Sequence, residues 1–161
     1  MPLIHHPYGK ARVRVMRVHR DGDHNEVREL SVQTMLKGEF GESFAEGNNR
    51  SVIATDTIRN IAYIVARENM TASTELYGQA LAARFLARYK QVQQVRVSLH
   101  ETRWTRASIG GKPHPHSFVL DANGRPTAEV VAPRDGTATV TSGIAGYTFM
   151  KSTGSGWVGA T

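Results

Sequence analysis

The chain has 161 residues, a length that suits one compact domain with a core large enough to fold without disulfides or a structural metal. Hydrophobic residues make up 40% of the sequence, which excludes a disordered protein. The absence of cysteine rules out disulfide bonds, thiolate metal sites and cysteine nucleophiles.

The sequence carries an excess of positive charge, with 20 Lys and Arg against 14 Asp and Glu, a formal net charge of +6. A basic surface can bind nucleic acid or attract small anions. The positive residues are scattered along the chain, however, and no nucleic-acid partner is predicted. No apolar run approaches the roughly 20 residues needed to span a bilayer, and the segment MPLIHHPYGK lacks the apolar stretch of a secretory signal. We therefore expect a cytoplasmic protein with no membrane partner.

Two strands are predicted near the start of the chain. In residues 11–19, Val13 and Val15 alternate with polar residues, as in a half-buried strand. Residues 27–37 alternate in the same way, and the turn-rich segment DGDHNE between them predicts a hairpin. The following segment, GEFGESFAEGNN, has the composition of a loop.

Two helices are predicted next. Apolar residues of the first recur with helical spacing and form one face: Ile58, Ile61, Ala62, Val65 and Ala66. Thr55 or Asp56 would stand at its start, since Thr and Asp commonly cap helices. The second helix is predicted from about Glu75 to Tyr89. The face expected to pack against a neighbour holds Leu76, Ala80, Ala83 and Ala87.

The rest of the chain is predicted to form strands. Residues 92–104 alternate again, IGGKPHP is predicted to be a turn, and HSFVLD, TAEVVA and ATVTSGIAGYTFMKS are predicted strands. The order of the elements predicts an α+β fold, an antiparallel β-sheet with two helices packed on one face. The sequence has no glycine-rich phosphate loop and no β-α-β alternation, so nucleotide hydrolysis and dinucleotide binding are not favoured.

Lys10, in the segment YGK before the first strand, is the first candidate for chemistry. As an ordinary residue it is a solvated lysine at a strand end. A lysine that acts as a base near neutral pH needs its pKa lowered by about 3 units, through burial or cationic neighbours. A threonine hydroxyl could relay the proton. Thr55, in SVIATDTIRN, could serve in such a relay or only begin the helix, and the residues alone leave both readings open.

The segment KPHPHSF is the second candidate. His114 and His116 are two residues apart, so in a strand both rings would lie on one face, an arrangement that could suit a metal. No Asp, Glu or further His lies close by in the sequence, and His100 could join them only through the fold. A turn fixed by Pro113 and Pro115 is the favoured interpretation, and no metal is predicted.

Five short segments of the chain are spaced as in one known family: YGK, VIATDTIRN, RWTR at 103–106, KPHPHSF, and KST at 151–153. In their order and at these intervals they resemble the urate oxidases (uricases). The resemblance extends from residue 8 to about residue 155. RWTR and KPHPHSF are the most specific of the five.

The resemblance implies a tunnelling fold, in which several sheets with their helices assemble into a barrel around a tunnel. It implies oxidation of urate by O₂ to 5-hydroxyisourate and hydrogen peroxide, with no metal or organic cofactor. Matched segment by segment, Lys10 would be the catalytic base and Thr55 its partner in a Lys-Thr dyad. Thr55 and Asp56 would also hold the purine, Asp56 through its backbone. Free N–H groups at a helix N-terminus suit an anionic purine.

The chain also departs from the family pattern. A typical member carries two tandem tunnelling-fold domains, whereas residues 1–161 are expected to form a single one, with a divergent tail from about residue 156. Family members complete the site with an arginine, a glutamine, an asparagine and a histidine that this chain does not match. At the position of the family's stacking phenylalanine stands Trp157, which would either stack on urate or pack as an ordinary tail residue.

Two interpretations follow from the resemblance. In the first, the chain is a urate oxidase that works as a homo-oligomer on urate and O₂. In the second, it is a non-catalytic domain that oligomerises and at most binds a purine. A tunnelling-fold enzyme acting on pterins fits less well, because such enzymes anchor the ring with a glutamate and the segments here match urate oxidase.

Overall fold

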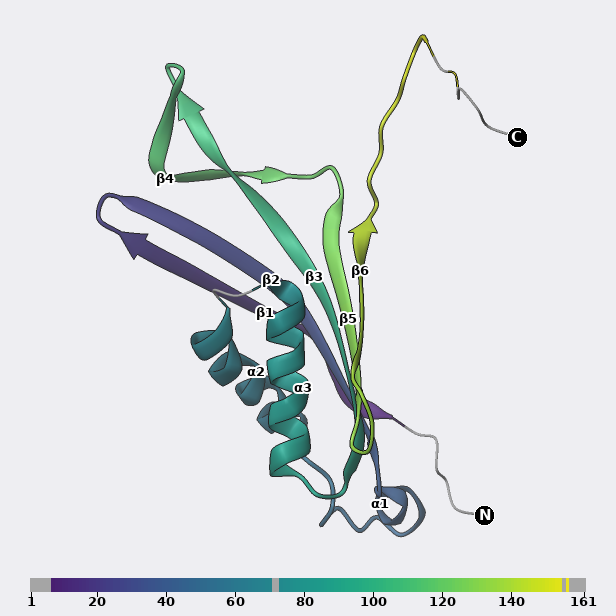
Figure 1. Ribbon diagram of the computed structural model, residues 1–161. Coiled ribbons are helices and arrows are strands. Elements are labelled where there is room, and N and C mark those ends of the chain that lie inside the picture. Colours follow the sequence, from purple (N-terminus) through teal and green to yellow (C-terminus); the bar gives the residue numbers. More distant parts are fainter. Residues whose placement is uncertain (1–6, 71–72, 155, 157–161) are drawn as a thin grey trace.

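The computed structural model describes residues 7–70, 73–154 and 156, which form an α+β fold (Figure 1). The strands are β1 (Tyr8–Asp21), β2 (His24–Gly38), β3 (Val92–Ile109), β4 (Lys112–Asp121), β5 (Arg125–Pro133) and β6 (Thr139–Ala145). The helices are α1 (Gly41–Ala45), α2 (Thr55–Asn69) and α3 (Thr74–Arg88). Within the described residues the strands pair antiparallel in the order β1-β2-β3-β5-β6, and β4 pairs with β3 outside this path. The predicted fold class is confirmed.

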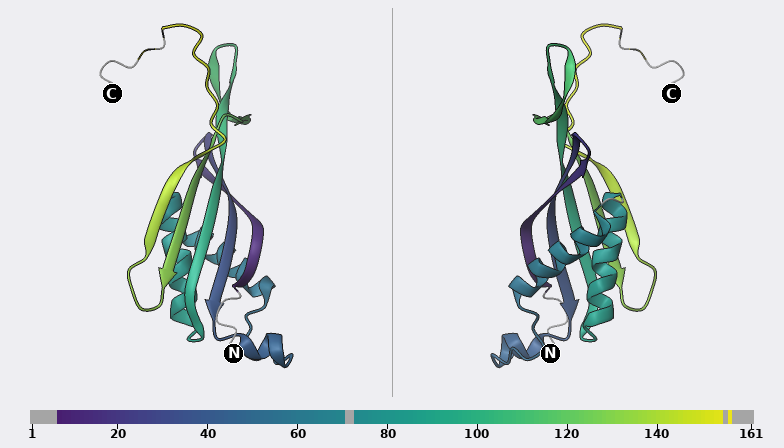
Figure 2. Two further views of the ribbon diagram at one scale, coloured as in Figure 1. Left: turned by 90° about the vertical axis from the view of Figure 1, so that its right-hand side faces the viewer. Right: turned by 90° about the vertical axis from the view of Figure 1, so that its left-hand side faces the viewer.

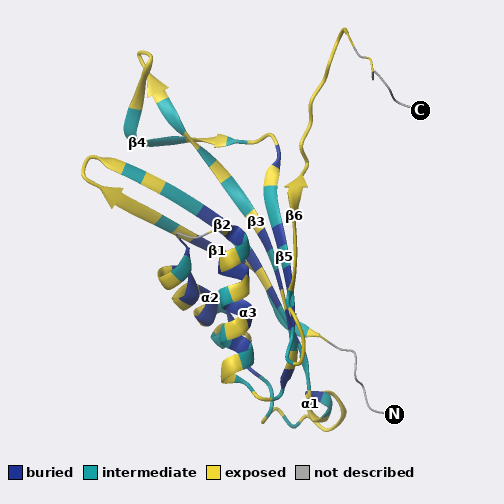
Figure 3. Ribbon diagram, in the orientation of Figure 1, coloured by how far each residue is buried: buried dark blue, intermediate teal, exposed yellow. Residues whose placement is uncertain are grey.

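The two long helices cover one face of the sheet and leave the other face bare, as the two side views show (Figure 2). Strand side chains that face the helices are apolar and buried; they include Val13, Val15, Leu30, Val32, Val95, Val97, Leu99, Ala128 and Val130. Burial is concentrated where sheet and helices overlap, and the far ends of the β1–β2 and β3–β4 hairpins extend beyond the helices (Figure 3). The hydrophobic core is therefore a single layer between the helices and one sheet face.

Helix α2 packs with the face that the sequence predicted. Its buried residues are Ile58, Ile61, Ala62, Val65 and Ala66, and the helix lies against β1. The helical spacing identified this face because the opposite side of α2 is mostly polar.

The face predicted for α3 is wrong. Three of its four residues, Leu76, Ala83 and Ala87, are exposed, and only Ala80 packs, partly buried, against the core. The buried face holds Thr74, Tyr77, Gly78, Leu81, Ala82 and Phe85. Both sides of this helix are apolar, so spacing alone does not choose between them, and burial of the large aromatic side chains decides. The Tyr77 hydroxyl donates a hydrogen bond to the Ala62 carbonyl (3.0 Å) and so ties α3 to α2, and burial raises the pKa of this phenol far above its usual value.

Two other segments differ from the prediction. The predicted loop contains α1, a single helical turn in which the Ser43 hydroxyl donates to the Phe40 carbonyl (2.7 Å). So short a helix forms from local bonds and shows no apolar periodicity for sequence analysis to detect. The last predicted strand is too long: β6 ends at Ala145, and Gly146 then adopts a left-handed φ of 68° that a regular strand does not use.

The predicted proline-fixed turn is also wrong, because Pro113 and Pro115 lie inside β4. Within the described residues β4 pairs only with β3, so it is an edge strand, where a missing N–H donor is tolerated. Pro113 pairs with Ser108 next to an irregularity in the ladder, and the turn itself is made by Gly110 and Gly111.

A polar network fastens both helices to the sheet. Arg28 of β2 donates to the Met70 carbonyl just after α2 (2.7 Å) and to Thr74 Oγ1 at the start of α3 (2.7 Å). Thr74 donates in turn to Glu101 of β3 (2.7 Å), whose carboxylate lies 3.7 Å from Arg28. The last carbonyl groups of a helix have no partners within it, so Arg28 satisfies one of them while joining the layers. No helix of the described residues is long and apolar enough to cross a membrane.

Gly78 allows α3 to approach the sheet closely. A Cβ atom at this position would lie 2.8 Å from Val130 Cγ2 and 2.9 Å from Leu99 Cδ1. We expect Gly78→Val to lower the free energy of unfolding by about 1–3 kcal/mol more than Ala83→Val, which places the same side chain on the exposed face of α3. Urea denaturation measures both variants, and equal losses would contradict this role for Gly78.

Candidate functional site

A β-bulge in β1 decides which way Lys10 faces. Lys10 pairs with Thr34 and Val13 pairs with Val32, so β1 has one more residue than β2 over the same interval. Residues directly opposite each other in a ladder point to the same face. Thr34 and Val32 are buried on the helix-covered face. Lys10 therefore shares that face with Val13, which strict alternation along a regular strand would not allow.

Two backbone features accompany the bulge. Gly9 lies so close to β2 that a Cβ atom would meet the Thr34 carbonyl oxygen at 1.8 Å. Arg12, inside the bulge, has a φ of 56°, a left-handed conformation that costs a non-glycine residue about 1 kcal/mol. Bulges are over-represented next to active sites, where they redirect a side chain. The glycine of YGK therefore allows β1 to lie close against β2, and the bulge turns Lys10 toward the helices.

Tyr8 joins the start of β1 to the segment before α2. Its hydroxyl oxygen accepts a hydrogen bond from the Ile53 N–H (2.7 Å), and its ring lies edge-on to Phe40 with 4.7 Å between the centroids. Burial raises the pKa of the Tyr8 phenol, and the bond from Ile53 partly opposes this shift. The two segments that the sequence singled out, YGK and SVIATDTIRN, therefore meet in the fold.

Helix α2 runs alongside β1 in the same direction. Its start is held by the bond between Tyr8 and Ile53, and its end by a bond from the Arg17 guanidinium to the Arg67 carbonyl (3.1 Å). Lys10 follows Tyr8 by two residues on the same face of β1. Lys10 therefore lies toward the first turn of α2.

The first turn of α2 is open. The helix begins at Thr55, and Ala54 occupies the N-cap position without a side-chain capping bond. The prediction that Thr55 or Asp56 stands at the start of the helix is confirmed, but neither residue is the N-cap, since both already belong to the helix. Its first main-chain bond runs from the Ile58 N–H to the Ala54 carbonyl (3.1 Å), so the N–H groups of the first three helical residues have no acceptor within the helix.

The predicted site residues differ in their surroundings. Lys10 is partly buried, whereas Thr55 and Asp56 are exposed, and the Asp56 carboxylate lies 3.6 Å from the Arg59 guanidinium. Among the described residues no hydrogen bond or ion pair joins Lys10 to Thr55. Trp157 lies outside the described residues. The fold thus brings the Lys10 and Thr55 segments together without a direct bond between the two side chains.

The two histidines of KPHPHSF lie side by side on β4. Their ring centroids are 4.8 Å apart, and the His116 N–H donates to His114 Nδ1 (3.3 Å). His100 lies away from them, in the part of β3 that pairs with β2 and β5. No group of three or more His, Cys, Asp or Glu in the described part of the chain is arranged to hold a metal.

Sequence reasoning missed how RWTR and KPHPHSF contact each other. Arg106 donates to the carbonyls of His114 (3.0 Å), Pro115 and Asn25, and its guanidinium lies 5.0 Å from the centre of the Phe118 ring. One arginine of β3 thus holds both β4 and the start of β2. In this chain the two segments fix the β3–β4 hairpin.

Glu29 is a second residue that the sequence did not single out. Its side chain is only 3% exposed, on the helix-free face of the sheet, and the guanidinium of Arg14 forms an ion pair with it. The Trp104 N–H donates to its other carboxylate oxygen (2.9 Å). A buried carboxylate has to be paired in this way. Trp104 is 75 residues away along the chain, so no local pattern could reveal the contact.

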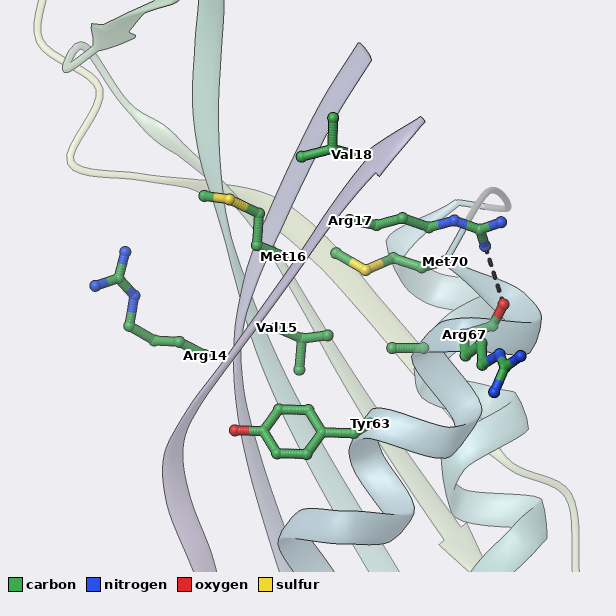
Figure 4. A pocket seen from close by; sticks show the side chains of 9 residues that line it. Arg14, Val15, Met16, Arg17, Val18, Tyr63, Arg67 and Met70 are labelled. Carbon is green, nitrogen blue, oxygen red and sulfur yellow. Dashed lines mark hydrogen bonds between the residues drawn. The ribbon is translucent and has the colours of Figure 1, made fainter. Parts of the chain in front are cut away.

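A groove of about 530 Å³ lies between β1 and the second half of α2 (Figure 4). Its lining combines apolar side chains with arginines: Val15, Met16, Val18, Tyr63, Ala66 and Met70 with Arg14, Arg17 and Arg67. Lys10, Thr55 and Asp56 are not part of it. The groove and the predicted site therefore lie at opposite ends of the contact between α2 and β1.

An antiparallel sheet with two adjacent helices on one face, and with the lysine of its first strand turned toward the first of them, defines a tunnelling-fold domain of the urate oxidase type. The sequence model of the Uricase family matches residues 6–131. The chain belongs to the uricase family.

Individual relatives agree with this assignment. The chain is 37% identical over 150 residues to the uricase of Aspergillus flavus, and the matched segment covers 92% of this chain and 50% of that protein. It is 39% identical over 160 residues to the uricase of Dictyostelium discoideum, with 98% and 55% covered. The crystal structure of the uricase from Arthrobacter globiformis superposes with a TM-score of 0.80 at 30% identity, over 88% of this chain and 47% of that one. The chain thus spans about half the length of the curated relatives it matches.

The bond between Tyr8 and Ile53 can be tested by Tyr8→Phe. The variant leaves the buried Ile53 N–H without its acceptor, so we expect the free energy of unfolding to fall by about 1 kcal/mol. Tyr147→Phe, at an exposed tyrosine, is the control and should change little. Chemical denaturation of both variants gives the comparison, and a Tyr8→Phe protein as stable as the wild type would contradict the assignment.

The raised pKa of Tyr8 adds a pH signature to this test. The folded chain resists ionisation of this phenol, whereas the unfolded chain ionises near the ordinary value of 10.0. Stability is therefore lost as the pH rises from that value through the folded pKa. Tyr8→Phe should remove part of this loss at high pH.

Proposed function

We propose that this chain supplies the lysine–threonine half of a urate oxidase site, built from YGK and the first turn of α2. In the proposed reaction urate, O₂ and water give 5-hydroxyisourate and hydrogen peroxide, without metal or organic cofactor. One observation carries the proposal: the bulge in β1 and the bond between Tyr8 and Ile53 direct Lys10 to the first turn of α2 in a chain of the uricase family.

Lys10 serves as the general base in this proposal. Its unprotonated amine accepts a proton from urate through the Thr55 hydroxyl, which is too weak a base to act alone. The relay forms only when the two side chains come into hydrogen-bonding contact, and apo sites commonly tighten only when substrate binds.

The open first turn of α2 serves as the urate-binding element. Free N–H groups at the positive end of a helix favour an anionic purine. Asp56 contributes its N–H group, since its carboxylate is directed to Arg59 and would repel an anion. Trp157 is proposed to stack on the purine ring through its indole.

This half of a site needs further groups to complete it, and we propose that the chain assembles as a homo-oligomer. This chain spans about half the length of the relatives it matches. Within the described residues β1 and β6 each have one unpaired edge, which a lone sheet exposes to solvent. Tyr147, Phe149 and Met150, directly after β6, are exposed as well. Assembly would cover these apolar side chains and both edges.

Solution scattering tests the assembly. At micromolar concentration we expect a particle several times the mass of the 17.7 kDa chain, because pairing between copies would cover the two exposed sheet edges. A monodisperse monomer under these conditions would contradict the homo-oligomer.

A urate assay tests the catalytic proposal. Loss of urate absorbance should proceed at the same rate with and without a metal chelator. Lys10→Met should reduce turnover by about 10²- to 10⁴-fold, the usual contribution of a general base. Since Lys10 and Thr55 act as one relay, the double variant with Thr55→Ala should lose about as much as Lys10→Met alone, with thermal stability little changed.

Lys90→Met is the matched control, because Lys90 is exposed beyond the end of α3 and should not affect turnover. Wild-type activity should fall as the pH drops, because a protonated amine cannot accept a proton. Full turnover by Lys10→Met would refute the mechanism. A wild-type protein that binds urate without turnover would instead indicate a non-catalytic domain.

A further inference from the structure

The helix-free face of the sheet contains a recess of about 490 Å³. It forms where β3 changes its neighbour: β3 pairs with β5 over residues 94–100 and with β4 over residues 103–109. Figure 1 shows β4 turning away from the rest of the sheet beyond this point. Its lining includes the buried Glu29 of β2, which forms the floor, together with Trp104 of β3 and three arginines.

The negative charge on the floor is already neutralised. One carboxylate oxygen of Glu29 accepts from Arg14 and the other accepts from the Trp104 N–H. This buried carboxylate therefore has little capacity left to bind a further arginine, and it leaves the other cations of the recess unpaired.

Arg12 and Arg125 line the recess from opposite sides. Neither forms a hydrogen bond or ion pair with any residue that the structure describes. Arg12 lies in β1 and Arg125 is the first residue of β5, three strand spacings away across the sheet, or about 14 Å at ~4.8 Å per strand. The register also places Arg125 four residues further along the strands, about 13 Å at ~3.3 Å per residue, so the two backbones are about 19 Å apart and only the long side chains reach into the recess between them. The bulge that turns Lys10 toward the helices leaves Arg12 on this opposite face, in its left-handed conformation.

We propose that this recess binds a small oxyanion with two or more negative charges. Three arginines against one carboxylate give its lining a net charge of +2. Guanidinium groups bind phosphate and carboxylate oxygens through paired N–H donors. An anion held between Arg12 and Arg125 would connect β1 and β5, two strands that do not pair with each other. This site is independent of the proposed urate chemistry, which uses the helix-covered face.

Inorganic pyrophosphate and citrate are suitable probes, because they carry the same kind of charge on phosphate and on carboxylate groups. The sequence has two tryptophans, so Trp157→Phe leaves Trp104, which lines the recess, as the sole tryptophan, and its emission can be excited selectively over that of the tyrosines. We expect its fluorescence to change in a saturable way with pyrophosphate, at constant ionic strength set by chloride. Isothermal titration calorimetry gives the affinity and stoichiometry.

Arg12→Gly and Arg125→Gln test the two side walls. Glycine suits the left-handed backbone at position 12, so the first variant removes the charge without destabilising the bulge. Each should weaken pyrophosphate binding roughly three- to tenfold, a modest factor because both arginines are exposed to solvent, and the double variant should abolish it. Arg20→Gln, an exposed arginine near the other end of β1, is the matched control and should bind as the wild type does.

The outcomes are distinct. Binding that depends on Arg12 and Arg125 but not on Arg20 supports the site, and the stronger of the two probes identifies phosphate or carboxylate as the preferred group. Equal weakening by Arg20→Gln would show only diffuse attraction to a basic surface, and would refute the site. Absence of saturable binding to either probe would refute it as well.

Discussion

One additional residue in β1, accommodated between Lys10 and Val13, sets the direction of the side chains at the start of the sheet. Before the bulge Tyr8 and Lys10 face the helices; beyond it Val13 faces the helices too and enters the core. Without the bulge, Lys10 and Val13 could not both face the helices, because a shift of one residue moves every side chain of a strand to the other face. The left-handed backbone of Arg12 is the local cost of that arrangement.

The same bulge separates two chemical environments across one sheet. On the helix-covered face, Tyr8 binds the segment before α2 and brings Lys10 to an open helix start. The contrast with α3 is informative, since Ser73 caps that helix by accepting a bond from Leu76 N–H (3.2 Å). On the bare face, the buried carboxylate of Glu29 holds β1, β2 and β3 together through its two partners.

The sequence by itself determined the elements whose pattern is local. Alternation along β1, β2 and β3 and the apolar face of α2 predicted the α+β fold, because one face of each element is apolar and the other polar. The spacing of five short segments indicated the uricase family. It also identified Lys10, Thr55 and Asp56 as candidates, although the cap role suggested for Thr55 is not the one the helix uses.

Tertiary structure decided what depends on contacts between distant residues. The buried face of α3 follows from which side chains fit the sheet, with Gly78 allowing the close approach, and a helix that is apolar on both sides does not encode that choice locally. The prolines of KPHPHSF are compatible with a strand because β4 lies at an edge. Likewise, the orientation of Lys10 is set by pairing with β2, since a one-residue bulge leaves hardly any trace in the alternation of the sequence but reverses the face on which a side chain lies.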